Sequence, residues 1–287
     1  MDDTAPYLLT EPTTLVSDAV FSSPHSGRHY PGAFVRQSRL DLVSLRASED
    51  ALVDRLFAPA PREGAPLLTA TWPRAWLDLN RAPTELDPAL IEGVRGQGLN
   101  QRVAAGLGVV PRVVSEGRAI YDGKIPRAEA EARIEAVHVP YHDCLERLLL
   151  RAKRRFGQAV LFDCHSMPSE ALRAAPRVKG RCPEIVLGDR FGAAAGRTLV
   201  ALTQEAFERA GFAVARNAPF AGGYITQRYG RPQSGWHAIQ IEIDRGLYLD
   251  QRRVEPGPGF ASLVHALDGV IAELTGLGRS LLGIAAE

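Results

Sequence analysis

The sequence predicts an α/β protein built on a mainly parallel, mixed sheet that is flanked by helices. Short apolar runs that end in polar or turn residues alternate along the chain with longer segments of helical periodicity. The composition agrees, because 45% apolar and 23% charged residues are typical of a globular protein that buries a large core. We expect residues 1–287 to form a single domain.

The expected strands are apolar runs bounded by turn residues. They span 18–27, 65–72, 158–166, 183–189, 212–220 and 237–246, with 75–81 as an extended continuation of the second. Helical spacing predicts helices over 38–58, 126–157, 189–211 and 260–276. In the second helix Pro126 suits the first turn, Pro140 forces a kink or break, and Gly157 suits the end. Ligands of such sheets bind beyond the carboxyl ends of the strands.

Charge and composition exclude several classes of partner. A net charge of +1 gives no indication of nucleic-acid binding. The acidic N-terminus lacks the pattern of a signal peptide, and no window approaches 18 uninterrupted apolar residues, so no membrane span is expected. Three cysteines without a C-x-x-C spacing favour a cytoplasmic location. We therefore expect a small-molecule ligand, and the sequence leaves the oligomeric state open.

Two histidines stand at the ends of predicted strands. His25 follows the strand of 18–27, and His165 lies in "LFDCHSMPS". Because alternate residues of a strand share a face, Asp163 and His165 point the same way, and the carboxylate can fix the tautomer of a metal-binding imidazole. The alternatives are a surface histidine at position 25 and a purely structural Asp163–His165 hydrogen bond.

A tetrahedral zinc site in a hydrolase needs a third protein ligand and keeps one position open for water. The segment "SEDALVDRL" (48–56) offers Glu49, Asp50 and Asp54 as that ligand. Asp50 and Asp54 are four residues apart and share a face of the predicted helix. A solvated helix face explains the same pattern, and composition alone does not choose among the three.

A polar row in "HAIQIEIDRG" (237–246) supplies a candidate general base. Gln240, Glu242 and Asp244 alternate with isoleucines. On an edge strand such a row faces water, but in a sheet covered on both sides it faces a cavity. Glu242 would then be a confined carboxylate of the kind that general-base catalysis requires.

Further polar segments are candidates for substrate binding. In "DLNR" (78–81), Asn80 and Arg81 could bind a substrate carboxylate, for which guanidinium has matching geometry. The glycine-hinged segment 217–232 is a candidate lid that carries Asn217, Tyr224 and Arg228, although it could also be a long connection. The segment "HVPYH", with His138 and His142, lacks the glutamate of H-E-x-x-H, so we interpret it mainly as structural.

Taken together, the segments resemble the N-formylglutamate amidohydrolase family. The resemblance is carried in family order by "PHSG", "DALVDRL", "DLNRAP", "PYH", "DCHSMPS", "LGDRFG", "NAPFAGGYIT" and "IQIEIDRGLYLD", which span residues 24–250. It implies a zinc-dependent hydrolase with a fold similar to the zinc carboxypeptidases. The implied reaction converts N-formyl-L-glutamate and water into L-glutamate and formate, within histidine breakdown.

The resemblance also implies roles for individual residues. His25 and His165 look like metal ligands, and Asp50 falls on the third, with Glu49 adjacent. Arg28 stands where the carboxypeptidase-like pattern H-x-x-E has its acid, so that pattern is not met. Glu242 looks like the general base. Asn80 and Arg81 look like carboxylate binders, and Arg81 or Tyr224 is a candidate donor to the oxyanion.

Three hypotheses follow for function. The first is zinc-dependent hydrolysis of N-formyl-L-glutamate, with another divalent ion as a possible native metal. The second is a metal-dependent deacylase or carboxypeptidase that acts on another N-acyl amino acid or small peptide. The third is a catalytically silent protein that binds an acidic metabolite.

Overall fold

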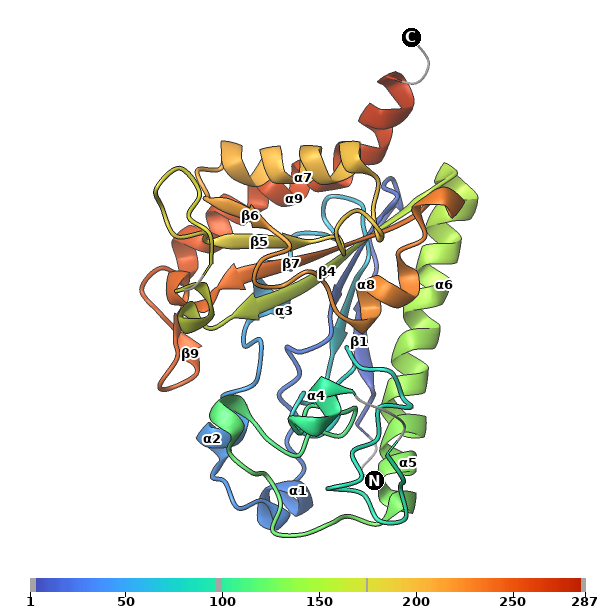
Figure 1. Cartoon of the computed structure of the whole chain (residues 1–287). Coiled ribbons are helices and arrows are strands. Elements are labelled where there is room, and N and C mark those ends of the chain that lie inside the picture. Colours follow the sequence, from blue (N-terminus) through green and yellow to red (C-terminus); the bar gives the residue numbers. More distant parts are fainter. Residues whose placement is uncertain (1–3, 97–99, 174, 285–287) are drawn as a thin grey trace.

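A computed structural model describes residues 4–96, 100–173 and 175–284 (Figure 1). Within these residues the main sheet has seven strands in the order β1-β3-β2-β4-β7-β5-β6. The strands are β1 (Tyr7–Thr10), β2 (Ala19–Ser23), β3 (Leu67–Ala70), β4 (Ala159–Met167), β5 (Ile185–Gly188), β6 (Val214–Arg216) and β7 (Trp236–Asp244). A small hairpin of β8 (Leu249–Asp250) and β9 (Glu255–Pro256) lies apart from this sheet.

The centre of the sheet is parallel and its edges are not. β3, β2, β4 and β7 run in one direction, β1 is antiparallel to β3, and β5 is antiparallel to β7 while β6 is parallel to β5. The prediction of a mixed, mainly parallel sheet is therefore confirmed. All six predicted strands are present, whereas β1 was not anticipated from the sequence.

Helices cover both faces of the sheet. On one face lie α3 (Val53–Leu56), α7 (Arg197–Arg209) and α9 (Phe260–Ile284), with α7 and α9 side by side, and the long helix α6 (Val139–Phe156) covers the other (Figure 1). Along β4, Val160 and Phe162 pack into the first core and Leu161 into the second. This alternation is the strand period of two, so neither face of the central strands meets bulk water.

Several predicted elements differ from the structure. Residues 75–81 form turns rather than a strand, and Trp76 and Leu77 donate their backbone N–H groups to the Pro73 carbonyl. The predicted helix 38–58 is broken into α2 (Leu42–Arg46) and α3, because Leu52 adopts a left-handed backbone with φ of 67° that no helix tolerates. The short helices α1 (Gly32–Gln37) and α4 (Gln101–Ala104) were not predicted.

Proline residues and residues with positive φ set the limits of the remaining helices. The segment 126–157 forms α5 (Arg127–Arg133), a π-helical turn (Ile134–His138) and α6, so the helix changes character just before Pro140. It ends at Gly157, whose φ of 81° suits a C-cap. The helix expected from residue 189 starts only at Arg197, because Arg190 and Phe191 both have positive φ.

Helix α9 is long and apolar enough to cross a membrane by length and composition alone. Its 19-residue stretch Phe260–Gly278 has a mean hydropathy of 1.3. Its buried side chains Leu267, Ile271 and Leu274 pack into the core shared with α7 and the sheet. Packing against the sheet therefore accounts for its apolar side.

Candidate metal centre and active site

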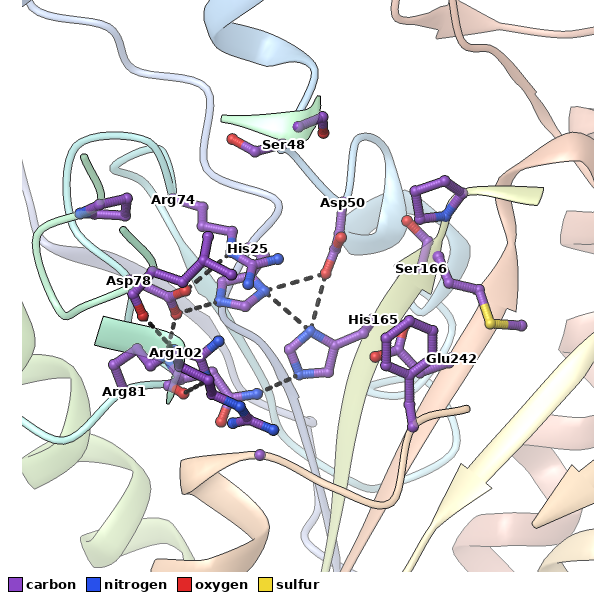
Figure 2. A pocket seen from close by; sticks show the side chains of 18 of the residues that line it. His25, Ser48, Asp50, Arg74, Asp78, Arg81, Arg102, His165, Ser166 and Glu242 are labelled. Carbon is purple, nitrogen blue, oxygen red and sulfur yellow. Dashed lines mark hydrogen bonds and ion pairs between the residues drawn. The ribbon is translucent and has the colours of Figure 1, made fainter. Parts of the chain in front are cut away.

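Three predicted ligands converge at the carboxyl ends of the central parallel strands (Figure 2). The Nδ1 atoms of His25 and His165 lie 3.1 Å apart. Asp50 Oδ2 lies 2.9 Å from His165 Nδ1 and 3.3 Å from His25 Nδ1. All three side chains are buried, and they come from the loop after β2, the turn before α3, and β4.

The spacing of these donors fits a divalent ion. Zn–N and Zn–O bonds of roughly 2.0–2.1 Å in a tetrahedron separate the donors by about 3.3 Å, close to the distances measured among the three side chains. Two imidazole Nδ1 atoms and a carboxylate oxygen are also ligands that zinc prefers. The residues present therefore fit a zinc-type site.

Local backbone contacts bring Asp50, and not Glu49, to the histidines. The backbone N–H of Asp50 donates to the His25 carbonyl at 3.0 Å, which ties the two ligand-bearing segments together. The Glu49 carboxylate turns the other way and accepts from Arg46 Nε at 3.1 Å. Asp54 pairs with Arg28 outside the cluster. Of the three acids that the sequence offered, Asp50 is the one whose carboxylate lies beside the histidines.

The chain carrying His25 passes unusually close to the segment after β3. A Cβ atom on Gly27 would lie 2.0 Å from the Trp72 carbonyl oxygen, which no side chain permits. Glycine in "PHSG" is therefore required by this close backbone approach, which fixes the loop that presents His25.

A carboxylate holds the outer nitrogen of each histidine. Asp78 Oδ1 lies 2.7 Å from His25 Nε2, and Asp163 Oδ2 lies 3.0 Å from His165 Nε2. Within the described part of the chain, neither oxygen of Asp163 makes a hydrogen bond of good geometry. The ion pair with His165 therefore offsets the free-energy cost of burying the Asp163 carboxylate. Each pairing places the proton on Nε2 and turns the Nδ1 lone pair toward Asp50, as metal-binding histidines require.

As expected, Asp163 and His165 share a face of β4 while Cys164 packs into the opposite core.

The pKa of His165 reflects the acids around it. Burial alone would lower this pKa, but Asp163 and Asp50 outweigh burial and raise it well above the usual value. The surrounding acids therefore favour positive charge at this position.

Two arginines neutralise the acids of the cluster. Arg245 Nη2 donates to Asp50 Oδ1 at 2.9 Å, and Arg74 Nε donates to Asp78 Oδ2 at 3.0 Å. Burial would raise the pKa of Asp78, but Arg74 and His25 lower it well below the usual value. Asp50 and Asp78 are thus held as carboxylates. In each, one oxygen accepts from an arginine and the other faces a histidine.

Glu242 lies beside the ligand cluster. It is the register partner of His165 across β4 and β7, and it lines the same cavity. Gln240 Nε2 donates to Glu242 Oε1 at 2.8 Å, and Gln240 itself accepts from the Gly223 N–H. Burial raises the pKa of Glu242 to about 7, which is the range expected of a general base at neutral pH.

The cavity at this site has a volume of about 730 Å³, and its lining contains four arginines and the three carboxylates of Asp50, Asp78 and Glu242. Arg74, Arg81 and Arg102 line it (Figure 2), and so does Arg245. Arg81 donates to the backbone carbonyls of Leu107 and Asn80 but to no carboxylate among the described residues. Arg102 lies exposed on α4. Arg81 and Arg102 therefore carry charge that can act on an anionic ligand.

Asn80 lies in the cavity as predicted, but it contacts the ligand cluster directly. Its Nδ2 lies 3.3 Å from His165 Nε2, and its Oδ1 accepts from the Ile225 N–H at 2.8 Å. The amide is thus held between the metal site and the start of α8 (Tyr224–Tyr229). Asn80 therefore lies against the ring of His165 and lines the cavity.

Three predicted substrate contacts lie away from the cavity. Asn217 has a φ of 59° and turns back, so that its side chain binds Asp189. Tyr224 accepts from Arg228 Nη1 at 2.9 Å, and Arg228 also pairs with Glu146 of α6. The segment 217–232 lines the cavity instead through residues 219–223. Helix α8 directs its polar side chains toward α6, which sequence spacing could not show.

Sequence reasoning missed Asp78, Arg74, Arg102 and Arg245. Asp78 lies in a turn segment that was expected to be a strand, two residues before Asn80. Arg245 follows the polar row of β7, directly after Asp244. The signal for Asp78 was a third polar residue in "DLNR", and the signal for Arg245 was its place at the end of a strand that carries Glu242.

Known proteins resemble this chain over nearly its whole length. The family model for N-formylglutamate amidohydrolase matches residues 17–249. An N-formylglutamate deformylase of Pseudomonas aeruginosa is 32% identical over 259 residues, covering 89% of this chain and 90% of that protein. Another, from Pseudomonas putida, is 30% identical over 272 residues and covers 93% of each.

Solved structures agree with these relatives. The N-formylglutamate amidohydrolase of Ralstonia eutropha JMP134 superposes with a TM-score of 0.89 at 34% identity, covering 96% of this chain and 99% of that one. The Agrobacterium tumefaciens gene product Atu2144 shares the fold, with a TM-score of 0.63 at 21% identity, covering 98% of this chain and 97% of that one.

Fold, site and relatives together define a hydrolase that acts on amide bonds. Within that class, the chain belongs to the N-formylglutamate amidohydrolase family. The resemblance carried by the sequence segments is therefore confirmed.

Proposed function

We propose that this chain hydrolyses N-formyl-L-glutamate to L-glutamate and formate, with one Zn²⁺ held by His25, Asp50 and His165. One observation carries the proposal. The three donors meet within 4.8 Å of one another, beside Glu242 and in a cavity lined by arginines. Family membership supports the reaction, and the arginines of the lining support an acidic substrate.

The proposed ligand set leaves a free position on the cavity side for water. When bound, a Zn²⁺ ion supplies Lewis-acid polarisation of the formyl carbonyl and lowers the pKa of water to about 7. Asp78 and Asp163 fix the tautomers of the two histidines, and Arg245 orients Asp50. These contacts keep the three donors aimed at one point.

Glu242 is the proposed general base. Its carboxylate accepts a proton from the attacking water and passes it to the amine nitrogen as the C–N bond breaks. Gln240 holds the carboxylate through one oxygen, which leaves the other available for this transfer. Burial keeps its pKa close to 7, so the proton can be both accepted and released.

Arg81 and Arg102 are the proposed partners of the two substrate carboxylates. Neither guanidinium is committed to an acid among the described residues, in contrast to Arg74 and Arg245. Arg81 is nearly buried, so a carboxylate placed against it forms a charge-assisted hydrogen bond that water competes with poorly. Asn80 borders the same space.

A substrate panel tests the proposal. Zinc-loaded protein is assayed for hydrolysis of N-formyl-L-glutamate, N-formyl-L-alanine, N-acetyl-L-glutamate and N-succinyl-L-glutamate. We expect kcat/KM to be higher for N-formyl-L-glutamate than for N-formyl-L-alanine, because loss of the side-chain carboxylate removes a charge-assisted bond worth about 1.5–3 kcal/mol. We also expect kcat/KM to be lower for the N-acetyl and N-succinyl compounds than for N-formyl-L-glutamate. A higher kcat/KM for another acyl group would reassign the substrate, and binding without turnover of any compound would refute the reaction.

A further inference from the structure

Two buried histidines that no step of the reaction uses lie against the back of the active-site segment 78–81. His138 ends the π-helical turn and His142 lies four residues later in α6. His138 Nε2 lies 2.9 Å from the Arg81 carbonyl oxygen, and His142 Nε2 lies 2.9 Å from the Leu79 carbonyl oxygen. Their ring centroids are 4.2 Å apart.

The hydrogen-bond partners fix the tautomer of each ring. A carbonyl oxygen only accepts, so Nε2 carries the proton in both histidines. His142 Nδ1 lies 3.0 Å from the Tyr229 hydroxyl, which also donates to the His142 backbone carbonyl at 3.2 Å. Burial lowers the pKa of both rings, so they remain neutral donors. Their geometry is that of fixed hydrogen-bond donors and not of proton carriers.

The segment that they contact has no strand to hold it. Three consecutive carbonyls in it are satisfied by side chains: Leu79 by His142, Asn80 by Arg81 Nη1, and Arg81 by His138. Buried carbonyls left without donors would cost free energy, so the segment takes its path from these bonds. The two histidine contacts fall on Leu79 and Arg81, on either side of Asn80, and hold this turn segment at two points.

This segment supplies much of the active site. Its first residue, Asp78, holds His25 Nε2, and Asn80 and Arg81 line the cavity. An error of about 1 Å in such groups is enough to reduce activity strongly.

We propose that His138 and His142 are positioning residues that set segment 78–81 in register with the metal ligands. The kinetic part of this inference rests on the proposed function, whereas the metal-binding part does not. His142 acts through Leu79, which neighbours Asp78, so it governs the hold on His25 and hence metal affinity. His138 acts through Arg81, so it governs substrate binding.

The test compares variants that keep or lose the Nε2 donor. Glutamine places its amide nitrogen near the position of histidine Nε2, whereas asparagine is one carbon shorter and leucine has no donor. For H142L and H142N we expect Zn²⁺ affinity, measured by competition with a chelating dye, to fall roughly 10- to 100-fold. For H138L and H138N we expect KM for N-formyl-L-glutamate to rise about tenfold with a smaller change in kcat. H142Q and H138Q should restore wild-type values.

Tyr141→Phe is the matched control. It removes a buried hydrogen bond from the same helix, between Tyr141 Oη and Ser22 Oγ at 2.8 Å, without touching segment 78–81. We expect this variant to lower the melting temperature while Zn²⁺ affinity and KM stay unchanged. If the histidines served stability alone, their variants would likewise show a lower melting temperature with unchanged Zn²⁺ affinity and KM.

The glutamine and asparagine variants decide the question even if the leucine variants fail to fold. Equal Zn²⁺ affinity in H142Q, H142N and wild type, together with equal KM in H138Q, H138N and wild type, would overturn the inference. If wild-type protein fails to hydrolyse N-formyl-L-glutamate while H142N still loses Zn²⁺ affinity and H142Q regains it, the proposed substrate fails and the positioning role of His142 stands.

Discussion

His25 and His165 are 140 residues apart in the chain, yet their Nδ1 atoms face each other at 3.1 Å. The two side chains stand at the carboxyl ends of neighbouring parallel strands, β2 and β4. Each ring is braced from behind by an acid, Asp78 or Asp163. Two imidazole nitrogens brought this close and turned toward a third acid are stable only when a proton or a cation lies between them.

The acid behind His25 should be needed for tight metal binding. We predict that Asp78→Asn lowers Zn²⁺ affinity roughly 10- to 100-fold, because the amide no longer holds the Nε2 proton as a carboxylate does. Equilibrium competition with a chelator measures the change. Asp54→Asn is the control, since Asp54 pairs with Arg28 outside the cluster. Unchanged affinity in the Asp78 variant would contradict the bracing role.

Removal of the base should separate metal binding from turnover. We predict that Glu242→Gln keeps Zn²⁺ and lowers kcat roughly 10²- to 10⁴-fold, because the amide cannot accept the proton of water. Metal analysis and formate release are measured on the same sample. Glu255→Gln, in the exposed hairpin strand β9, should behave like wild type. Near-normal turnover in the Glu242 variant would exclude Glu242 as the base.

The same carboxylate predicts the acid side of the pH profile. Burial raises the pKa of Glu242 to about 7, and only its deprotonated form acts as a base. As pH falls through this pKa, log kcat/KM should therefore decrease with a slope of about one per pH unit. A bound cation nearby lowers the apparent pKa of this acid limb below 7. Initial rates with saturating metal measure this. A kcat/KM that increases between roughly pH 8 and pH 6 would be inconsistent with the mechanism.

Arg102 should act on substrate binding more than on turnover. We predict that Arg102→Ala raises KM for N-formyl-L-glutamate about tenfold with little change in kcat, because it removes a charge used equally in the ground and transition states. Arg127→Ala, which breaks an exposed pair with Glu131 on α5, is the control. An unchanged KM would place the substrate carboxylates elsewhere in the cavity.

Strand patterns in the sequence located three of the residues that line this cavity. Apolar runs located β2 and β4, polar–apolar alternation marked β7, and His25, His165 and Glu242 lie near the ends of these strands. Strand alternation also placed Asp163 beside His165 and Cys164 in the opposite core. These inferences succeed because strand geometry is regular and parallel strands end at a common edge.

What the sequence could not predict lies in irregular backbone. The predicted helix is interrupted between Arg46 and the left-handed Leu52, and in this interruption Asp50 reaches the histidines while Glu49 turns to Arg46. Asp78 lies in an irregular segment whose carbonyls bind the side chains of His138 and His142. Asn217 lies outside the cavity lining, because its backbone has a positive φ and its side chain binds Asp189. Such conformations follow from tertiary contacts and leave no periodic signal.

The central claim is that His25, Asp50 and His165 hold one divalent ion on which hydrolysis depends. Calorimetric titration of chelator-treated protein with Zn²⁺, coupled to formate release at each addition, tests it most directly. We predict binding of one ion per chain, recovery of N-formyl-L-glutamate hydrolysis with the same stoichiometry, and loss of both in His165→Ala. Full hydrolysis by the metal-free protein, or by the His165 variant without tight binding of Zn²⁺, would contradict it.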